Sequence, residues 1–196
     1  MKIYDDVLPD DLLKECILLF CEDNMLWRLG KGVAYTEVDK VSRNQTLDIA
    51  KKNDISVIPD TNNVYMTNNL YDMYDGYQKL YEGIVKDIQH SIHNKLNVII
   101  WMRFKLNLMF CEDKPYVYGF HNDCVGWLND KLPHTTAVLY LDDSDGGTMF
   151  ADGTFVQSKK NRLVVFPNTT LHSSVSQTDS NIRTLINFNF ITGEEV

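Results

Sequence analysis

The stretch NVIIWMRFKLNLMF (residues 97–110) begins the half of the chain from which the fold can be inferred. From this stretch onward, short runs rich in β-branched and aromatic residues alternate with turn residues. The further runs are YVYGFHND, HTTAVLYL, GTMF, TFVQ, RLVVF, LHSSVS and IRTLINFNFI. About eight short strands at this spacing predict a jelly-roll-like double sheet over residues 97–191.

The first half of the chain, residues 1–96, carries helical patterns. The segment DDLLKECILLF (10–20) combines an apolar stripe at helical spacing with acidic residues in its first turn. Apolar residues at steps of three and four predict a longer helix over residues 69–93. Residues 28–68 are rich in Asn, Asp and Gly and predict loops with two short strands.

These patterns together predict one mainly β domain over residues 1–196, of the α+β class. Residues 1–96 would form a helix-bearing support region, with the helices packed on one sheet of the core. The net charge of −8 argues against nucleic-acid phosphates and anionic membranes as partners. No secretory signal or apolar membrane span is present, which predicts a cytoplasmic location. The sequence does not predict an oligomeric state.

Three possible metal ligands stand out in the strand-rich half. His121 and Asp123 are two positions apart, so on an extended strand both side chains project from the same face. A lone His-x-Asp pair is weak evidence, but His172 follows on a separate predicted strand. Two imidazoles and one carboxylate are the donor set of the facial triad, which holds ferrous iron and leaves coordination positions open. These residues therefore predict a catalytic metal site.

The segment IRTLINFNF places an arginine near this predicted site. Arg183, Leu185 and Asn187 share one face of the expected strand. The other face is the more apolar and carries Thr184, Ile186, Phe188 and Phe190. An arginine on the inner side of a sandwich is costly unless it meets an anion, and its planar fork suits a carboxylate. We therefore expect a small dicarboxylate between Arg183 and the metal.

With these residues in place, the sequence resembles the Fe(II)/2-oxoglutarate-dependent oxygenases, and among them the prolyl-4-hydroxylase-like branch. The resemblance spans about residues 97–190 and rests on YGFHND, YLDDSDGGTMF, RLVVFPNTTLHSSV and IRTLINFNF, in that order. It implies a double-stranded β-helix core of the jelly-roll or cupin-like kind. It also implies iron on His121, Asp123 and His172, and the distal carboxylate of 2-oxoglutarate on Arg183.

The resemblance assigns two further contacts and shows two departures. Tyr140 matches a tyrosine that hydrogen-bonds the same carboxylate, and Asn187 matches a polar contact to the co-substrate. Many relatives carry a tyrosine at the end of the strand before His-x-Asp, where this chain has Phe110 and Cys111. The gap between the second histidine and the arginine is also slightly longer than in several relatives.

The reaction that the resemblance implies needs Fe(II), 2-oxoglutarate and O2, with ascorbate as a reductant, and hydroxylates a C–H bond while releasing succinate and CO2. The carboxylate ligand Asp123 favours hydroxylation over halogenation. By analogy with the branch, we expect the substrate to be a peptidyl residue of the prolyl type. Two alternatives stay open: a hydroxylase of a free amino acid or small metabolite, and a non-catalytic jelly roll that binds a metal or ligand. Tyr118 and Trp127 are the candidate substrate contacts.

Overall fold

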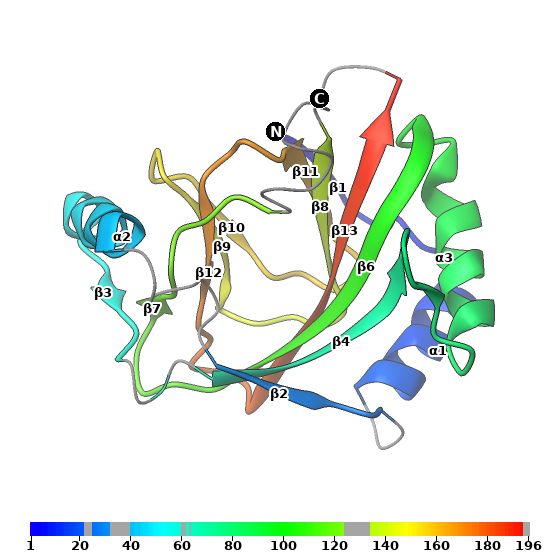
Figure 1. Ribbon diagram of the computed structural model, residues 1–196. Coiled ribbons are helices and arrows are strands. Elements are labelled where there is room, and N and C mark those ends of the chain that lie inside the picture. The colour runs from blue at the N-terminus through cyan, green and yellow to red at the C-terminus, as the bar shows by residue number, and fades with distance from the viewer. Residues whose placement is uncertain (22–24, 32–39, 60–61, 63, 124–133, 194–196) are drawn as a thin grey trace.

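A computed structural model describes residues 1–21, 25–31, 40–59, 62, 64–123 and 134–193, which form two facing β-sheets and three helices (Figure 1). The larger sheet has the order β1 (Lys2–Tyr4), β11 (Leu163–Pro167), β8 (Thr135–Tyr140), β13 (Ile182–Thr192), β6 (Val98–Phe110), β4 (Val64–Asp72) and β2 (Arg28–Lys31), and β5 (Gly76–Tyr77) pairs with β4. The smaller sheet has the order β10 (Phe155–Gln157), β9 (Gly147–Phe150), β12 (His172–Val175), β7 (Tyr116–Val117) and β3 (Ser56–Val57). All strand pairs are antiparallel except β3 with β7. The predicted jelly-roll architecture is confirmed.

Helices α1 (Asp10–Phe20) and α3 (Glu82–His93) cover one face of the larger sheet (Figure 1). Alternate side chains of β6 and β13 meet them in the main hydrophobic cluster, as the alternation in the sequence predicted. Phe104 and Phe188 lie there with their ring centroids 4.5 Å apart and neither is exposed. Burying one such side chain stabilises the fold by roughly 2 kcal/mol. The opposite faces of β6 and β13 point toward the smaller sheet.

The predicted helix over residues 69–93 is wrong in its first part. Residues up to Asp72 belong to β4, which pairs along β6, and the helix begins only at Glu82. Gly76, the first residue of β5 after the turn, adopts a φ of +78°, a left-handed conformation that interrupts a helix. Leu70 is fully buried as the pattern suggested, but a strand presents it to the core.

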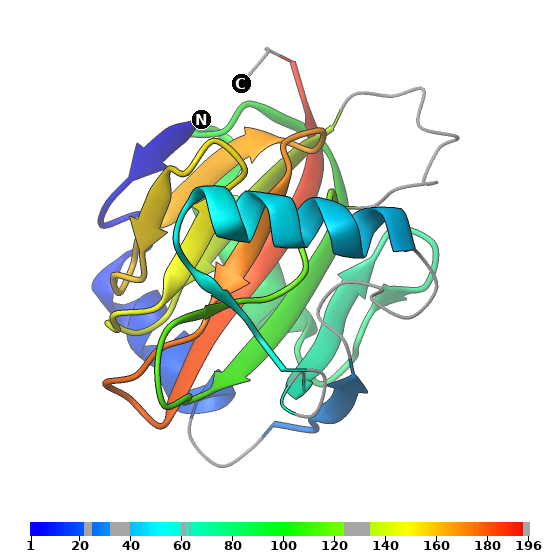
Figure 2. The same ribbon diagram turned by 90° about the vertical axis from the view of Figure 1, so that its left-hand side faces the viewer.

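A further helix, α2 (Lys40–Lys52), occupies part of the segment expected to be loops. It lies on the side of the molecule opposite α1 and α3, against the smaller sheet (Figure 2). Its side chain Ala50 joins a small apolar cluster with Val117 and Val175. Few apolar residues mark its sequence, and of its described side chains only Thr46 and Ala50 are buried. None of the helices among the described residues is long and apolar enough to cross a membrane.

A close approach between β9 and β10 fixes one glycine, which leads to a prediction. A methyl group at Gly147 would collide with the carbonyl oxygen of Val156 and the ring of Phe155. We expect Gly147→Ala to lower the free energy of unfolding by about 1–3 kcal/mol, measured by urea denaturation. Gly83, in α3, has open space around it, so Gly83→Ala is the matched control and should raise stability by about 0.5–1 kcal/mol. Equal effects of the two substitutions would contradict the packing described here.

Candidate metal centre

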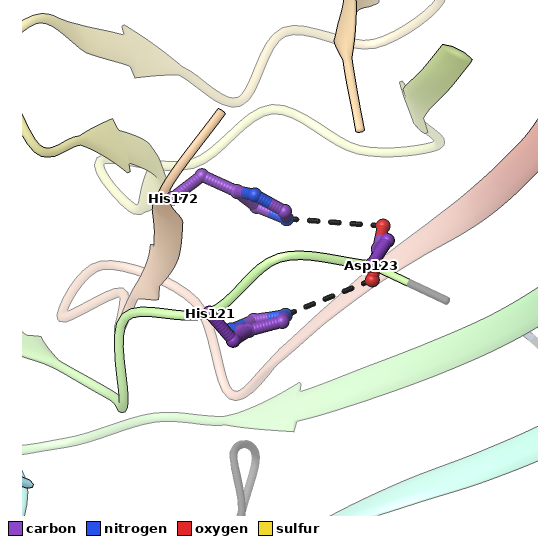
Figure 3. A group of neighbouring side chains, drawn as sticks. All are labelled: His121, Asp123 and His172. Atoms are coloured by element: carbon purple, nitrogen blue, oxygen red, sulfur yellow. Dashed lines mark ion pairs between the residues drawn. The ribbon is translucent and has the colours of Figure 1, made fainter. Parts of the chain in front are cut away.

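His121, Asp123 and His172 come together between the two sheets (Figure 3). Their ligand atoms all lie within 4.8 Å of one another. Each histidine Nε2 lies 3.8 Å from a different oxygen of the Asp123 carboxylate. The structure therefore brings together the three residues that the sequence predicted as metal ligands, in an arrangement that a single ion can bridge.

Backbone pairing sets the spacing of the two histidines. His172 begins β12, and His121 forms an isolated antiparallel bridge with it. The amide of each residue donates to the carbonyl oxygen of the other, at 3.0 and 3.1 Å. The segment before His121 is held by α2, where the hydroxyl of Thr46 accepts a hydrogen bond from the amide of Phe120 at 3.0 Å. The unpredicted helix thus supports the candidate site.

The orientation of both imidazole rings suits metal binding. Nδ1 of His121 lies 2.9 Å from the carbonyl oxygen of Gly119, and Nδ1 of His172 lies 3.0 Å from that of Thr170. Because a carbonyl oxygen only accepts, each Nδ1 carries the proton and each Nε2 keeps a free lone pair. Burial of the ring, and then its electrostatic interaction with His121, lower the pKa of His172 to about 4, so the His172 ring is neutral near pH 7.

Asp123 is held by two side chains from the larger sheet. Nδ2 of Asn187 on β13 donates to Oδ2 at 2.8 Å, and the guanidinium of Arg103 on β6 lies 3.5 Å from Oδ1. Arg103 also donates to Oδ1 of Asn187 at 3.1 Å. Burial opposes ionisation of Asp123, but the surrounding charges and hydrogen bonds outweigh it and hold its pKa below the ordinary value. The carboxylate is therefore ionised and oriented.

Arg103 was not among the residues predicted from the sequence, although β6 contains a signal for it. In MRFKLN the polar residues Arg103, Lys105 and Asn107 alternate with apolar ones. On a strand this alternation places all three on the face that does not meet the helices, which is the face of the candidate site.

A cavity of about 70 Å³ lies beside the three candidate ligands. Its walls include the apolar side chains of Met109, Val138 and Leu185 and the hydroxyl-bearing side chains of Thr148 and Ser174. A small compartment of mixed polarity next to a candidate metal site has the character of a ligand-binding pocket.

Arg183 and Tyr140 stand behind this wall and do not line the cavity themselves. Arg183 is 0% exposed, and its guanidinium donates to Ser174 Oγ at 2.6 Å and to the carbonyl oxygen of Val175 at 2.9 Å. The Tyr140 hydroxyl lies 2.7 Å from Thr148 Oγ1. Among the described residues, no carboxylate forms an ion pair with Arg183. Ser174, which lines the cavity, therefore lies between the guanidinium of Arg183 and the cavity.

Of the two predicted substrate contacts, the structure describes only Tyr118, which does not line the cavity. Tyr118 is fully buried beside Ile58 and Met109, and its hydroxyl has no hydrogen-bond partner among the described residues. Burial raises the pKa of Tyr118 to about 12, and the positive charge of Arg183 acts against this rise. Trp127 lies outside the described residues. Asn187 lines the cavity, but its amide group is engaged with Asp123 and Arg103.

The contact between Asn187 and Asp123 leads to a prediction about metal affinity. Asn187→Ala removes the donor that orients the carboxylate, so we expect the dissociation constant for a divalent ion to rise by about 10–100-fold. Titration with Co(II), followed by visible absorption, measures this change. Asn107→Ala is the matched control, because Asn107 lines the same cavity and bonds to Thr67 at 3.2 Å. Equal affinity of the two variants for the divalent ion would show that Asn187 does not orient a metal ligand.

Solved structures with a similar fold cover nearly the whole chain. The chain superposes on the viral collagen prolyl hydroxylase vCPH from Paramecium Bursaria Chlorella virus-1, in its 2OG complex, with a TM-score of 0.56 at 13% identity, covering 97% of this chain and 96% of that one. The chain has the fold of a prolyl hydroxylase. AviO1 from Streptomyces viridochromogenes Tue57 is also similar, with a TM-score of 0.54 at 12% identity over 98% of this chain and 89% of the other. No protein-family model and no curated protein sequence matches the chain.

Proposed function

We propose that the protein is an Fe(II)- and 2-oxoglutarate-dependent dioxygenase that hydroxylates a C–H bond of its substrate. The observation that carries the proposal is the convergence of two imidazole Nε2 atoms and one carboxylate beside a cavity that has a buried arginine behind its wall. Neither part alone is specific, since metal sites and buried arginines occur separately in many proteins. Their combination fits an iron site that also takes a small dicarboxylate.

The three candidate ligands fit ferrous iron. His121 and His172 offer neutral nitrogen donors and Asp123 offers an oxygen donor, which is the two-histidine, one-carboxylate set of non-haem iron oxygenases. Three protein ligands on one side leave positions open on the other. When bound there, iron together with 2-oxoglutarate and O2 supplies the oxidation that hydroxylates substrate and yields succinate and CO2.

The protein side chains around the cavity fit the distal carboxylate of 2-oxoglutarate. Ser174 Oγ accepts from Arg183, and Thr148 Oγ1 lies against the Tyr140 hydroxyl, so each keeps a hydroxyl proton for an acceptor in the cavity. A carboxylate bound here would offset the buried positive charge, which otherwise opposes the fold.

We further propose a peptidyl residue of the prolyl type as the substrate. Support comes from the overall likeness to a structure described as a collagen prolyl hydroxylase. Hydroxylation of a free amino acid or small metabolite is the alternative, because the same metal site and cavity serve either substrate. A non-catalytic metal-binding or ligand-binding jelly roll is the second alternative.

The proposed activity can be tested without knowing the substrate. The protein is incubated with Fe(II), ascorbate and 2-oxoglutarate in air, and succinate is measured by mass spectrometry. We expect slow succinate formation that stops when a chelator removes the iron. A peptide array and a pool of metabolites, each assayed for a mass gain of one oxygen atom, then separate the two substrate classes. Failure of the protein to bind 2-oxoglutarate in the presence of a divalent ion would favour the second alternative, a non-catalytic jelly roll that binds a metal or ligand.

A further inference from the structure

A second cavity, of about 210 Å³, adjoins the candidate metal centre. Its lining consists of Arg28, Thr67, Asn68, Asn69, Arg103 and Lys105. Arg103 and Lys105 also line the cavity beside the metal ligands, so the two compartments meet at these residues. We call this second cavity the basic cavity, and it shares the side chains of Arg103 and Lys105 with the first cavity.

The register of the larger sheet explains how the basic cavity forms. Arg28 on β2 lies opposite Thr67 on β4, and Asn69 on β4 lies opposite Lys105 on β6. Directly opposed residues of antiparallel strands project from the same face, so these four side chains share one face of the sheet. It is the face that carries Arg103, because Arg103 and Lys105 are two positions apart on β6.

The charge of the basic cavity contrasts with that of the whole chain. Of the six described residues that line it, three are cationic, none is acidic, and the other three are neutral and polar. The chain as a whole carries 27 acidic residues against 19 Lys and Arg. Several cations gathered in a concave site attract and hold an anion, and two of them are arginines, whose planar donors suit carboxylate or phosphate oxygens.

The two arginines differ in their other contacts. Arg103 lies 3.5 Å from Asp123 and donates to Asn187 and Asn189, so it connects the basic cavity with the metal ligands. Arg28 is at the far side of the cavity and is exposed. Lys105 stands between them, with its Nζ 3.3 Å from the hydroxyl of Tyr65. An anion seated at Arg28 and Lys105 would lie next to the candidate iron site without occupying it.

We propose that the basic cavity binds a carboxylate or phosphate group of the molecule that is oxidised. This inference rests on the proposed function and narrows it: the substrate carries a negative charge close to the carbon that is hydroxylated. This anionic group is distinct from the co-substrate, whose distal carboxylate the proposed function assigns to Ser174 and Thr148, two residues that line the first cavity and not the basic cavity.

Nuclear magnetic resonance tests the proposal with two probes, inorganic phosphate and acetate, at millimolar concentrations. The 15N-labelled protein is first loaded with Zn(II) and 2-oxoglutarate, and each probe is then added. We expect saturable shifts at the amides of Thr67, Asn69 and Lys105. Tighter binding of phosphate would indicate a phosphate-bearing substrate, and equal or tighter binding of acetate a carboxylate-bearing one. No saturable shift with either probe, or shifts only elsewhere, would overturn the proposal.

Substitutions assign the binding to the basic cavity. Arg28→Gln, at an exposed position, should weaken probe binding by about tenfold, and the double variant with Lys105→Gln by more. Lys14→Gln removes the same charge from an exposed lysine of α1 on the opposite side of the larger sheet and should leave binding unchanged. Equal binding in Arg28→Gln and Lys14→Gln would overturn the assignment.

The same samples separate this inference from the proposed function. Binding of Zn(II) and 2-oxoglutarate is recorded before the probes are added, from shifts at His121, His172 and Ser174. If that binding is absent and the probes still bind at β2, β4 and β6, the oxygenase proposal fails and the anion site stands. If the co-substrate binds and the probes do not, the oxygenase proposal is supported and the proposal of an anionic substrate is contradicted.

Discussion

Replacing His172 by alanine should reduce succinate formation from 2-oxoglutarate by at least about 100-fold, to the level of protein treated with a chelator. The substitution removes one of the three candidate ligands, and loss of mere supporting groups around a metal already costs about 10–100-fold. The ring of His172 is buried, and its Nε2 lies 3.8 Å from Oδ2 of Asp123, so alanine leaves the candidate site among the described residues with one nitrogen donor fewer. Succinate release and Co(II) affinity should fall together.

The control for this experiment is another histidine. His90 lies exposed on α3, on the opposite side of the larger sheet, so His90→Ala makes the same chemical change away from the cavity. It should retain both succinate release and Co(II) binding. Unchanged metal affinity in folded His172→Ala would place the ion elsewhere, and the oxygenase proposal would then lose its basis.

Replacing Arg183 by leucine should affect both stability and co-substrate binding. The carbonyl oxygens of Gly147 and Val175 and the hydroxyl of Ser174 would lose the donor that they share. Leaving such buried groups unpaired costs about 1–3 kcal/mol each, so we expect the free energy of unfolding to fall by about 3 kcal/mol or more. Urea denaturation measures this loss, and the KM for 2-oxoglutarate should rise in any fraction that remains folded.

Arg183→Lys separates the two effects. Lysine keeps the positive charge but loses the fork that reaches several acceptors at once, so stability should fall less than with leucine. We expect a KM for 2-oxoglutarate about tenfold above that of the unchanged protein, with Co(II) affinity preserved. An unchanged KM in this folded variant would show that Arg183 only supports the strands β9 and β12, and that the co-substrate carboxylate binds elsewhere.

The candidate metal ligands could be recognised in the sequence because their signal is local. A His-x-Asp pair and a histidine on a later strand indicate a metal site without any knowledge of how the strands pair. The structure places all three side chains together. The inner and outer faces of β13 were also predictable, since alternation in IRTLINFNF follows directly from the geometry of a strand. Chemistry that depends on residue type and short spacing is visible before folding.

The remaining features depend on contacts between distant segments. The stripe from Leu70 to Ile92 satisfies helical spacing, but pairing of β4 with β6 and the turn at Gly76 override it in the first part. Arg183 was expected to meet a ligand directly, whereas Ser174 from β12 stands between its guanidinium and the cavity. No local pattern in the arginine's own strand encodes a residue that β12 contributes.

The reciprocal backbone hydrogen bonds between His121 and His172 also carry a thermodynamic consequence. Pairing of the main chain holds the two candidate nitrogen ligands close together, so closing this part of the smaller sheet would also assemble the proposed ion site. Any ion that prefers the assembled site must stabilise that pairing by linkage, and any fraying of the pairing must release the ion. Binding of an ion at the candidate site and pairing of His121 with His172 in the smaller sheet are therefore thermodynamically coupled.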